Sequence, residues 1–308
     1  MTSNEVDMSS LQADGVAECY LCLGGDDVDT GQPLRRDCAC RGTDAGFVHL
    51  SCLVVFAATI SKAWDGRDMY EFTKPWRVCP GCHQEYQNEF AVDIASAFVT
   101  FNRSQYPRDT HKQVETLNLK LNAFNSMFRR LQHRQKSEAG VTANVLLSLI
   151  DRMKGEVSPL TMRYSFFAAN AYGVQGQIAF DEGTEESARR AVVQFDNQLE
   201  AFRAIDNNDG IAAANSNIVR AKSKYEGDSI EEEVLEASRV FYEACVANNG
   251  EEHEQTISAG NNYALRLLIN NHREKASELL TKLLATSKQV LGPHHNITKR
   301  IESSVVYL

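Results

Sequence analysis

Four short stretches of this sequence decide the fold of its N-terminal part: Cys19-Tyr-Leu-Cys22, Cys38-Ala-Cys40, His49-Leu-Ser-Cys52 and Cys79-Pro-Gly-Cys82. Seven of the eight cysteines lie in these stretches, and His49 supplies an eighth donor. Structural zinc sites hold the ion with four tetrahedral nitrogen or sulfur ligands, so eight donors predict two closed sites. We therefore expect two Zn²⁺ ions that contribute folding energy, with no ligand position left open for hydrolytic chemistry.

Other uses of these cysteines are disfavoured by their number and kind. Disulfides form in oxidising compartments, and seven is an odd number for pairing. Iron–sulfur clusters usually take four sulfurs and have no use for His49 and a further pair. The eighth cysteine, Cys245, lies far along the chain and is expected to be a small core residue.

The order of the donors resembles that of a RING-CH (RING-variant) finger. The shared features are seven cysteines with histidine in fifth place, one residue between the third and fourth ligands, and a long gap before the last pair. The resemblance implies a small α+β finger in which the pairs interleave as a cross-brace. One zinc ion would be shared by Cys19, Cys22, His49 and Cys52, and the other by Cys38, Cys40, Cys79 and Cys82.

A PHD finger has the same ligand order and is the main alternative. Eight residues separate Cys40 from His49, which is a longer gap than PHD fingers show. Trp76 also lies one residue further from Cys79 than the tryptophan of a PHD finger does. These departures favour the RING-CH type and leave a PHD-like histone-tail reader as the alternative.

The resemblance also implies a binding surface, because RING-type fingers recruit a ubiquitin-conjugating enzyme through an apolar groove. The matching residues are Leu21, Phe56 and Pro80, for which packing inside the small finger is the competing role. Many active RING fingers carry a cation directly after the final ligand, where this chain has His83. A neutral imidazole binds a carbonyl less well than a guanidinium does, which favours a non-catalytic interaction scaffold as an alternative function.

Apolar residues after the finger recur at helical spacing. Phe90, Ile94, Phe98 and Phe101 predict an amphipathic helix that is broken near Pro107. A second stripe, with steps of three and four, predicts another helix that packs within the chain or in a dimer: Val114, Leu117, Leu121, Phe124, Phe128 and Leu131.

A further helix is expected after Gly140, with Thr142 as its N-terminal cap.

From about residue 160 the sequence repeats. Ala179, Ala221 and Ala264 are 42 and 43 residues apart and lie near the ends of expected first helices. Small residues in the second helices are followed four places later by a large one: Ala191 by Phe195, Ala237 by Phe241, and Ala276 by Leu280. Stacked helix pairs bury a continuous core by placing small residues where helices cross and large ones beside them.

This pattern resembles tetratricopeptide (TPR) repeats of the longer kind found in kinesin light chains. Leu291-Gly-x-x-His295-x-x-Thr298 matches the segment between such repeats, and Gly250-x-x-His253-x-x-Thr256 is a weaker copy. Gln198 departs from the pattern, because a small residue is expected there. In a TPR-like α-solenoid the first helices line the concave face, so Asn217 and Asn262 are candidate contacts for a bound peptide.

Composition excludes several other classes of protein. The net charge of −9 disfavours a nonspecific nucleic-acid binder. The strongest apolar run, 47–60, is shorter than the roughly 20 residues of a membrane span. The sequence does not begin like a signal peptide, so we expect a cytoplasmic or nuclear protein without a membrane span. No catalytic nucleophile is recognisable, so any enzymatic chemistry would belong to a recruited partner.

The sequence thus predicts a zinc-stabilised α+β RING-CH-type finger in residues 15–86, a mostly α-helical connector in 87–158, and TPR-like helical repeats in 159–308. The leading functional hypothesis is a ubiquitin-ligase adaptor. Its finger would recruit a ubiquitin-conjugating enzyme, and its repeats would hold a protein or peptide client. The oligomeric state stays open.

Overall fold

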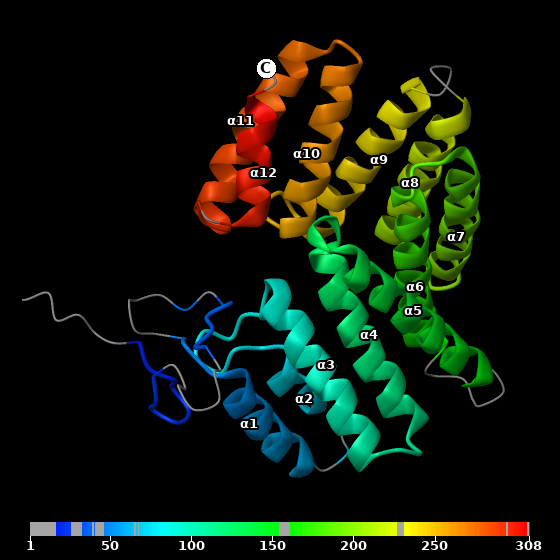
Figure 1. Ribbon diagram of the computed structural model, residues 1–308. Coiled ribbons are helices and arrows are strands. Elements are labelled where there is room, and N and C mark those ends of the chain that lie inside the picture. The colour runs from blue at the N-terminus through cyan, green and yellow to red at the C-terminus, as the bar shows by residue number, and fades with distance from the viewer. Residues whose placement is uncertain are drawn as a thin grey trace, which may run out of the picture. The chain divides into compact units, whose positions relative to one another are not determined.

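The computed structural model describes residues 17–25, 33–38, 40, 46–64, 66, 68–153, 161–226, 231–293, 295–306 and 308. Residues 15–16, 154–158 and 159–160, which lie at the limits of the three expected segments, are outside this described part. The chain forms two compact units, Met1–Lys136 and Ser137–Leu308, and helix α5 (His133–Met153) runs from one into the other (Figure 1). In the described part of the chain, no helix is long and apolar enough to cross a membrane.

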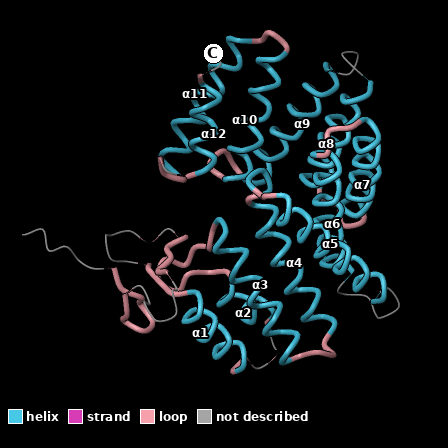
Figure 2. Tube along the Cα trace, viewed as in Figure 1, coloured by secondary structure: helices cyan, strands magenta, loops and turns pink. Residues whose placement is uncertain are grey.

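The first unit is a set of helices with irregular segments between them. Its elements are α1 (Leu50–Lys62), α2 (Met69–Thr73), the 3-10 turn η2 (Lys74–Trp76), α3 (Asn88–Gln105), α4 (Thr110–Ser126) and the 3-10 turn η3 (Phe128–Arg130). The irregular segments before α1 and between η2 and α3 carry Cys19, Cys22, Cys38, Cys40, Cys79 and Cys82. Two isolated antiparallel bridges join Arg35 to Val48 and Val78 to Glu85. Within the described residues there is no longer strand (Figure 2), so the structure does not show the α+β character expected of the finger.

One buried cluster holds the first unit together. Trp76 is fully buried and stacks on Phe98 of α3, with 4.7 Å between the ring centroids. Its indole N–H donates to the Ser61 hydroxyl at 2.8 Å, and that hydroxyl donates to the carbonyl of Phe72 at 3.1 Å. The same cluster contains Cys19. Helix α3 therefore contributes directly to the core beside the cysteines.

The stripe predicted between residues 114 and 131 is buried within the chain. All six of its apolar residues are at most 6% exposed, and they lie in α4, η3 and the residue after it. Helix α3 ends at Gln105, and the Asp109 side chain caps α4 by accepting from the backbone N–H of Lys112 at 3.0 Å. The expected break near Pro107 and the packing of the stripe inside the chain are both confirmed.

The start expected for the next helix is wrong. Helix α5 begins at His133, and both Gly140 and Thr142 lie inside it. The Thr142 hydroxyl donates to the carbonyl of Glu138 at 2.8 Å, as an interior threonine does, and caps nothing. One glycine costs a helix only about 1 kcal/mol, so the helix-forming residues before it outweigh that cost.

The second unit is a series of antiparallel helices in which each packs on the next (Figure 1). They are α6 (Thr161–Asp181), α7 (Glu185–Arg203), α8 (Asn208–Glu226), α9 (Glu231–Asn249), α10 (Glu254–Ile269), α11 (Arg273–Val290) and α12 (Asn296–Val305). The small residues Ala179, Ala191 and Ala221 are buried together, as are Ala264 and Leu280. The predicted TPR-like helical repeat is thus what the chain forms.

The segment between α11 and α12 shows why its sequence pattern repeats. Gly292 has a φ of +93°, a conformation that glycine adopts at no steric cost, and it ends α11. The Nδ1 atom of His295 caps α12 by accepting from the backbone N–H of Ile297 at 3.3 Å. The Thr298 hydroxyl donates to the carbonyl of Ser287 at 3.3 Å and so fastens α12 to α11.

The weaker copy 42 residues earlier folds in the same way. Gly250 has a φ of +81°, and His253 caps α10 by accepting from the N–H of Gln255 at 3.2 Å. The Thr256 hydroxyl donates to the carbonyl of Cys245 at 3.1 Å, which fastens α10 to α9. Each repeated residue of the pattern therefore forms a turn, a helix cap or a hydrogen bond between helices.

The departure at Gln198 is accommodated by a glycine on the facing helix. A Cβ at Gly173 of α6 would lie 2.4 Å from the Gln198 side-chain nitrogen. At Gly176, one turn further along α6, a Cβ would lie 2.5 Å from the ring of the buried Phe195. Helix α6 approaches α7 closely at both places because it carries no side chain there.

This packing predicts opposite effects for two glycine substitutions. Gly176→Ala should lower the free energy of unfolding by about 1–3 kcal/mol, because Phe195 must move in a filled core. Gly140→Ala is the control, since its Cβ would only touch the movable end of Ile178 at 3.3 Å. It should leave stability equal or raise it by up to about 1 kcal/mol. Urea denaturation measures both, and equal effects would contradict the assigned packing.

Candidate metal centre

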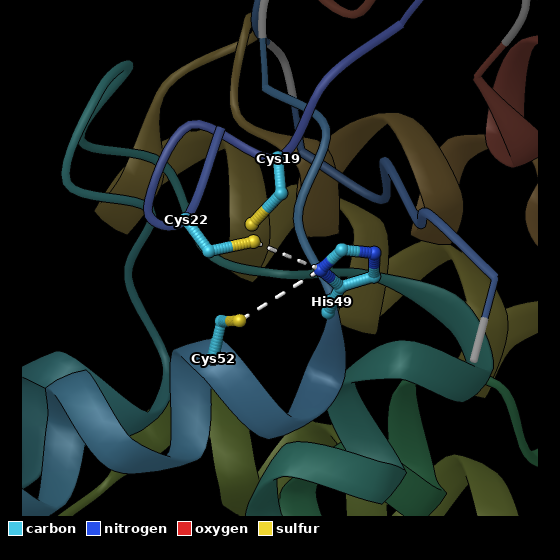
Figure 3. Close-up of side chains that lie close together, drawn as sticks. All are labelled: Cys19, Cys22, His49 and Cys52. Atoms are coloured by element: carbon cyan, nitrogen blue, oxygen red, sulfur yellow. Dashed lines mark hydrogen bonds between the residues drawn. The ribbon is translucent and has the colours of Figure 1, made fainter. Parts of the chain in front are cut away.

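The first group of donor side chains comprises Cys19, Cys22, His49 and Cys52 (Figure 3). Their donor atoms all lie within 4.8 Å of one another. The Nδ1 atom of His49 is 3.4 Å from the sulfur of Cys22 and 3.7 Å from that of Cys52. His49 is the N-terminal cap residue of α1 and Cys52 lies in its first turn, so one helix end presents two of the four donors.

The second group comprises Cys38, Cys40, Cys79 and Cys82, again with all donor atoms within 4.8 Å of one another. The sulfurs of Cys40 and Cys79 are 3.7 Å apart. All four are free cysteines, so none of these sulfurs is joined in a disulfide. The two groups coincide with the interleaved ligand sets that the RING-CH resemblance implies.

These distances can be compared with the dimensions of a zinc site. Tetrahedral zinc, with bonds of about 2.3 Å to sulfur and 2.0–2.1 Å to nitrogen, places a sulfur and a nitrogen about 3.6 Å apart. Two sulfurs on the same ion are about 3.8 Å apart. The observed sulfur–nitrogen distances of 3.4 and 3.7 Å and the sulfur–sulfur distance of 3.7 Å match these values. Either group could thus hold one metal ion, and the sulfur donors of both groups and the imidazole of the first suit zinc.

The orientation of the His49 ring is fixed by a second contact. Its Nε2 atom lies 2.8 Å from the carbonyl oxygen of Gly25, which can only accept a hydrogen bond. The proton of a neutral ring therefore sits on Nε2, and the lone pair of Nδ1 faces the sulfurs of Cys22 and Cys52. Histidine ligands of metals are usually held by this kind of outer contact.

A tight turn presents the first pair of cysteines. The backbone N–H of Leu23 donates to the carbonyl of Cys19 at 2.7 Å, and the N–H of Cys19 donates to the carbonyl of Gly24 at 2.8 Å. Leu23 has a φ of +61°, which bends the chain back after the second cysteine. Both cysteine side chains of the pair are thereby turned toward the same point.

The last pair of cysteines lies in a turn with the same hydrogen bonds. The N–H of His83 donates to the carbonyl of Cys79 at 2.9 Å, and the N–H of Cys79 donates to the carbonyl of Gln84 at 2.9 Å. His83 has a φ of +58°, nearly equal to that of Leu23. The sequence thus builds one turn twice, each time with a residue other than glycine in the left-handed conformation.

The thiols of the first group respond differently to their surroundings. Burial raises the pKa of Cys19, but backbone N–H groups of His49, Cys22 and Leu21 outweigh it and lower this pKa to about 7. For Cys52, burial and the thiols of Cys22 and Cys19 raise the pKa to about 11. One thiol of the group ionises readily, and its neighbour then holds its proton more firmly.

In the second group, burial raises the pKa of Cys40 to about 11, and the neighbouring thiols of Cys79 and Cys82 add to that rise. The pKa of Cys38 is raised as well, first by burial. Crowded thiols resist ionising together, whereas a divalent cation among them favours every thiolate at once.

Gly46 completes the wall of the second group. Its φ is +83°, and a Cβ there would lie 2.7 Å from the Cβ of Cys40 and 3.2 Å from the sulfur of Cys38. Any side chain at this position would press on two donors. Sequence analysis missed this residue, because a glycine inside a loop of undefined path carries no signal of what it approaches.

The residues predicted to form an apolar groove differ in exposure. Leu21 and Phe56 are half-buried and pack against the core of the first unit, whereas Pro80 is exposed. Sequence analysis missed two aliphatic residues that are much more exposed, Leu23 at 73% and Val55 at 67%. Leu23 directly follows a predicted ligand, and Val55 directly precedes Phe56 on α1. Their closeness in the sequence to residues already predicted for the site was the signal that could have identified them.

The candidate client contacts lie on first helices, as expected. Asn217 is half-buried on α8, and Asn262 is half-buried on α10, where its side-chain oxygen accepts from the guanidinium of Arg300 at 3.4 Å. That they contact a client stays a prediction. Cys245 is fully buried, and burial raises the pKa of its thiol to about 12, in keeping with a core role.

Comparison with known proteins gives similarity at the level of structure only. No family model matches the sequence, and no curated protein matches it. Two crystal structures of nearly identical TPR-like repeats from Podosopora anserina, ascribed to a kinesin light chain, are 14% identical to this chain. They cover 79% and 78% of this chain and 96% and 95% of their own, with TM-scores of 0.39 and 0.38. The repeat architecture is accordingly established from the helices of this chain.

The wall formed by Gly46 yields a test with a matched control. If each group holds one zinc ion, Gly46→Ala should disturb the second group and lower the zinc content from two ions per chain toward one. Gly66→Ala adds the same side chain at a φ of +89° with nothing within 4 Å, so it carries the backbone strain without touching a donor. It should retain two ions. Elemental analysis of protein purified without added zinc measures both, and equal metal content in the two variants would contradict the assignment.

Proposed function

We propose that the first unit is a RING-CH-type finger with two zinc ions, and that the protein acts as a ubiquitin-ligase adaptor. The interleaving of the donor pairs carries the proposal: the first and third pairs form one group, and the second and fourth pairs form the other. Cysteines that merely filled a core would have no reason to alternate in this way.

The zinc ions would contribute folding energy, about 10–16 kcal/mol of apparent affinity at each site. One would be held by Cys19, Cys22, His49 and Cys52, and the other by Cys38, Cys40, Cys79 and Cys82. All eight donors are then used, so the finger's own side chains bind and position a partner and carry out no chemistry on substrate. We propose the finger for residues 15–86, a helical connector for 87–158 and the repeats for 159–308.

The surface proposed to recruit a ubiquitin-conjugating enzyme is apolar, and its residues are sequence neighbours of donors in both groups, since Pro80 lies between Cys79 and Cys82. Leu21, Phe56 and Pro80 belong to it, and we add Leu23 and Val55 because of their exposure. A leucine that is both exposed and in the left-handed conformation stabilises neither the core nor the turn, and such strain costs about 1–3 kcal/mol. Strained residues gather at binding sites, which supports a role for Leu23 in contacting the partner.

The repeats would hold the client of this adaptor. Stacked helix pairs present extended surfaces that bind peptides, and the second unit has this architecture. We keep Asn217 and Asn262 as proposed client contacts. A client and a conjugating enzyme bound to one chain are brought to a high effective concentration, which is the physical basis of adaptor activity.

A second candidate function is a zinc-stabilised scaffold that binds protein without promoting ubiquitin transfer. His83 favours it, because this residue stands where a cation would hold the donor ubiquitin, and its backbone has a φ of +58°. A PHD-like histone-tail reader is the remaining alternative for the finger, and binding of unmodified and methylated histone-tail peptides to the full chain distinguishes it.

The strain at Leu23 gives the proposal a sharp test. Leu23→Asn should leave the free energy of unfolding equal or higher, because asparagine tolerates the left-handed conformation better than leucine. The same change should weaken binding of the conjugating enzyme about tenfold, as loss of an interface anchor does, and slow autoubiquitination with it.

His83→Asn is the matched control for stability and for binding of the conjugating enzyme, since it relieves the same backbone conformation in the other turn and leaves Leu23 in place. Calorimetric titration with a panel of ubiquitin-conjugating enzymes and an autoubiquitination assay provide the two readouts. If Leu23→Asn binds and transfers as well as the parent chain, the proposed surface is wrong. Binding that depends on Leu23 without any transfer would support the scaffold instead.

A further inference from the structure

Helices α8 and α9 enclose a pocket of ≈ 290 Å³ in the second unit. It is lined by Ala212, Asn215 and Val219 of α8 and by Ala237 of α9. Val240 of α9 stands at its edge and is 43% exposed. The pocket is therefore an apolar hollow that opens to solvent on one side.

The hollow lies at the helix pair that has the smallest buried cluster among the described repeats. One buried cluster is formed by α6, α7 and α8, and another by α10, α11 and α12. Val219 and Val234, with the partly buried Ala237, form a small cluster apart from both. The side chains of α8 and α9 thus leave an apolar space between the two helices unfilled, although the interiors of folded proteins are usually closely packed.

The rim of the hollow carries negative charge. Glu233 and Glu236 both line it and are exposed. The first turn of α9 adds Glu231, which pairs with Arg266 of α10 at 4.0 Å, and the exposed Glu232. Arg239 pairs with Glu236 at 2.5 Å and is the one cation in α9. A partner that fits this rim carries positive charge, because like charges facing each other across an interface cost affinity.

Size limits what the hollow can take. Pockets for cofactors and other small molecules usually measure about 300–1,000 Å³, so this one is at the lower bound. A single aliphatic side chain anchored in an apolar hollow, with charged groups around it, is the usual arrangement at protein interfaces.

We propose that the α8–α9 hollow binds a partner protein through one aliphatic side chain of the partner that is flanked by lysine or arginine. The inference rests on the proposed function in that it names a client surface on the repeats. It differs in place and chemistry from the candidate contacts Asn217 and Asn262, neither of which lines the hollow.

Three fluorescein-labelled peptides test this on the full zinc-loaded chain. The first, Lys-Lys-Ala-Leu-Ala-Lys-Lys, combines the anchor with positive charge; the second replaces its leucine by alanine; the third replaces its lysines by glutamates. We expect saturable binding of the first and at least about tenfold weaker binding of the other two. Affinity for the first should fall as salt is raised, because its charges face an exposed rim.

Variants of the chain locate the binding. Ala237→Leu fills the hollow from within and should weaken the first peptide about tenfold, with a melting temperature that is equal or higher. Val240→Ala acts at the exposed edge and keeps the test valid if the filled variant fails to fold; it should weaken binding about threefold. Val193→Ala is its control, since Val193 is an exposed valine on α7, at 56%, away from the hollow.

Three results would overturn the proposal: binding of the first peptide weaker than about 1 mM, equal binding of the acidic peptide, or unchanged affinity in a folded Ala237→Leu chain. The binding and ubiquitination assays on the finger test the proposed function independently of the hollow. If Leu23→Asn loses the conjugating enzyme while the basic peptide fails to bind, the hollow alone is rejected. If the peptide binds and the parent chain transfers no ubiquitin with any conjugating enzyme, the ligase role fails and the hollow stands.

Discussion

Crowding of donor atoms is the constraint on which the first unit depends. Seven sulfurs and one imidazole converge at two points, with neighbouring donors as close as 3.4 Å. Burial and neighbouring thiols raise the pKa of Cys40 and Cys52 to about 11, so the thiols oppose one another's ionisation. Two twin turns, the end of α1 and the contact of His49 with Gly25 all serve to hold these donors together. A bound cation would stabilise every thiolate at once, which accounts for the number of contacts that hold these donors together.

Close approach is the corresponding constraint in the second unit. Helix α6 reaches α7 where Gly173 and Gly176 leave room for Gln198 and Phe195. Glycine, histidine and threonine recur 42 residues apart because the glycine ends one helix, the histidine caps the next, and the threonine joins the two by a hydrogen bond. The pair α8–α9 shows the consequence of looser packing, since its core is small and a hollow remains.

Sequence reasoning reached those features that depend on spacing along the chain. The eight donors, the buried stripe ending at Leu131 and the helical repeats all have a period or a fixed interval. It missed features that depend on what meets in space. Gly46 matters because of its distance from Cys40, Leu23 because of its backbone conformation, and Thr142 because a helix continued through a glycine. The interleaved grouping of donors was accessible only through the resemblance to a family, since spacing alone permits other groupings.

The central claim, that two metal ions are held by interleaved pairs, is tested most directly by X-ray absorption at the zinc edge of a Cys79→Ala chain. This change removes one donor from the second group and leaves the first intact. The account predicts that the ion retained by the chain has three sulfur ligands at about 2.3 Å and one nitrogen ligand at about 2.0 Å. An ion with four sulfur ligands would show instead that consecutive pairs share a site, and would contradict the cross-brace.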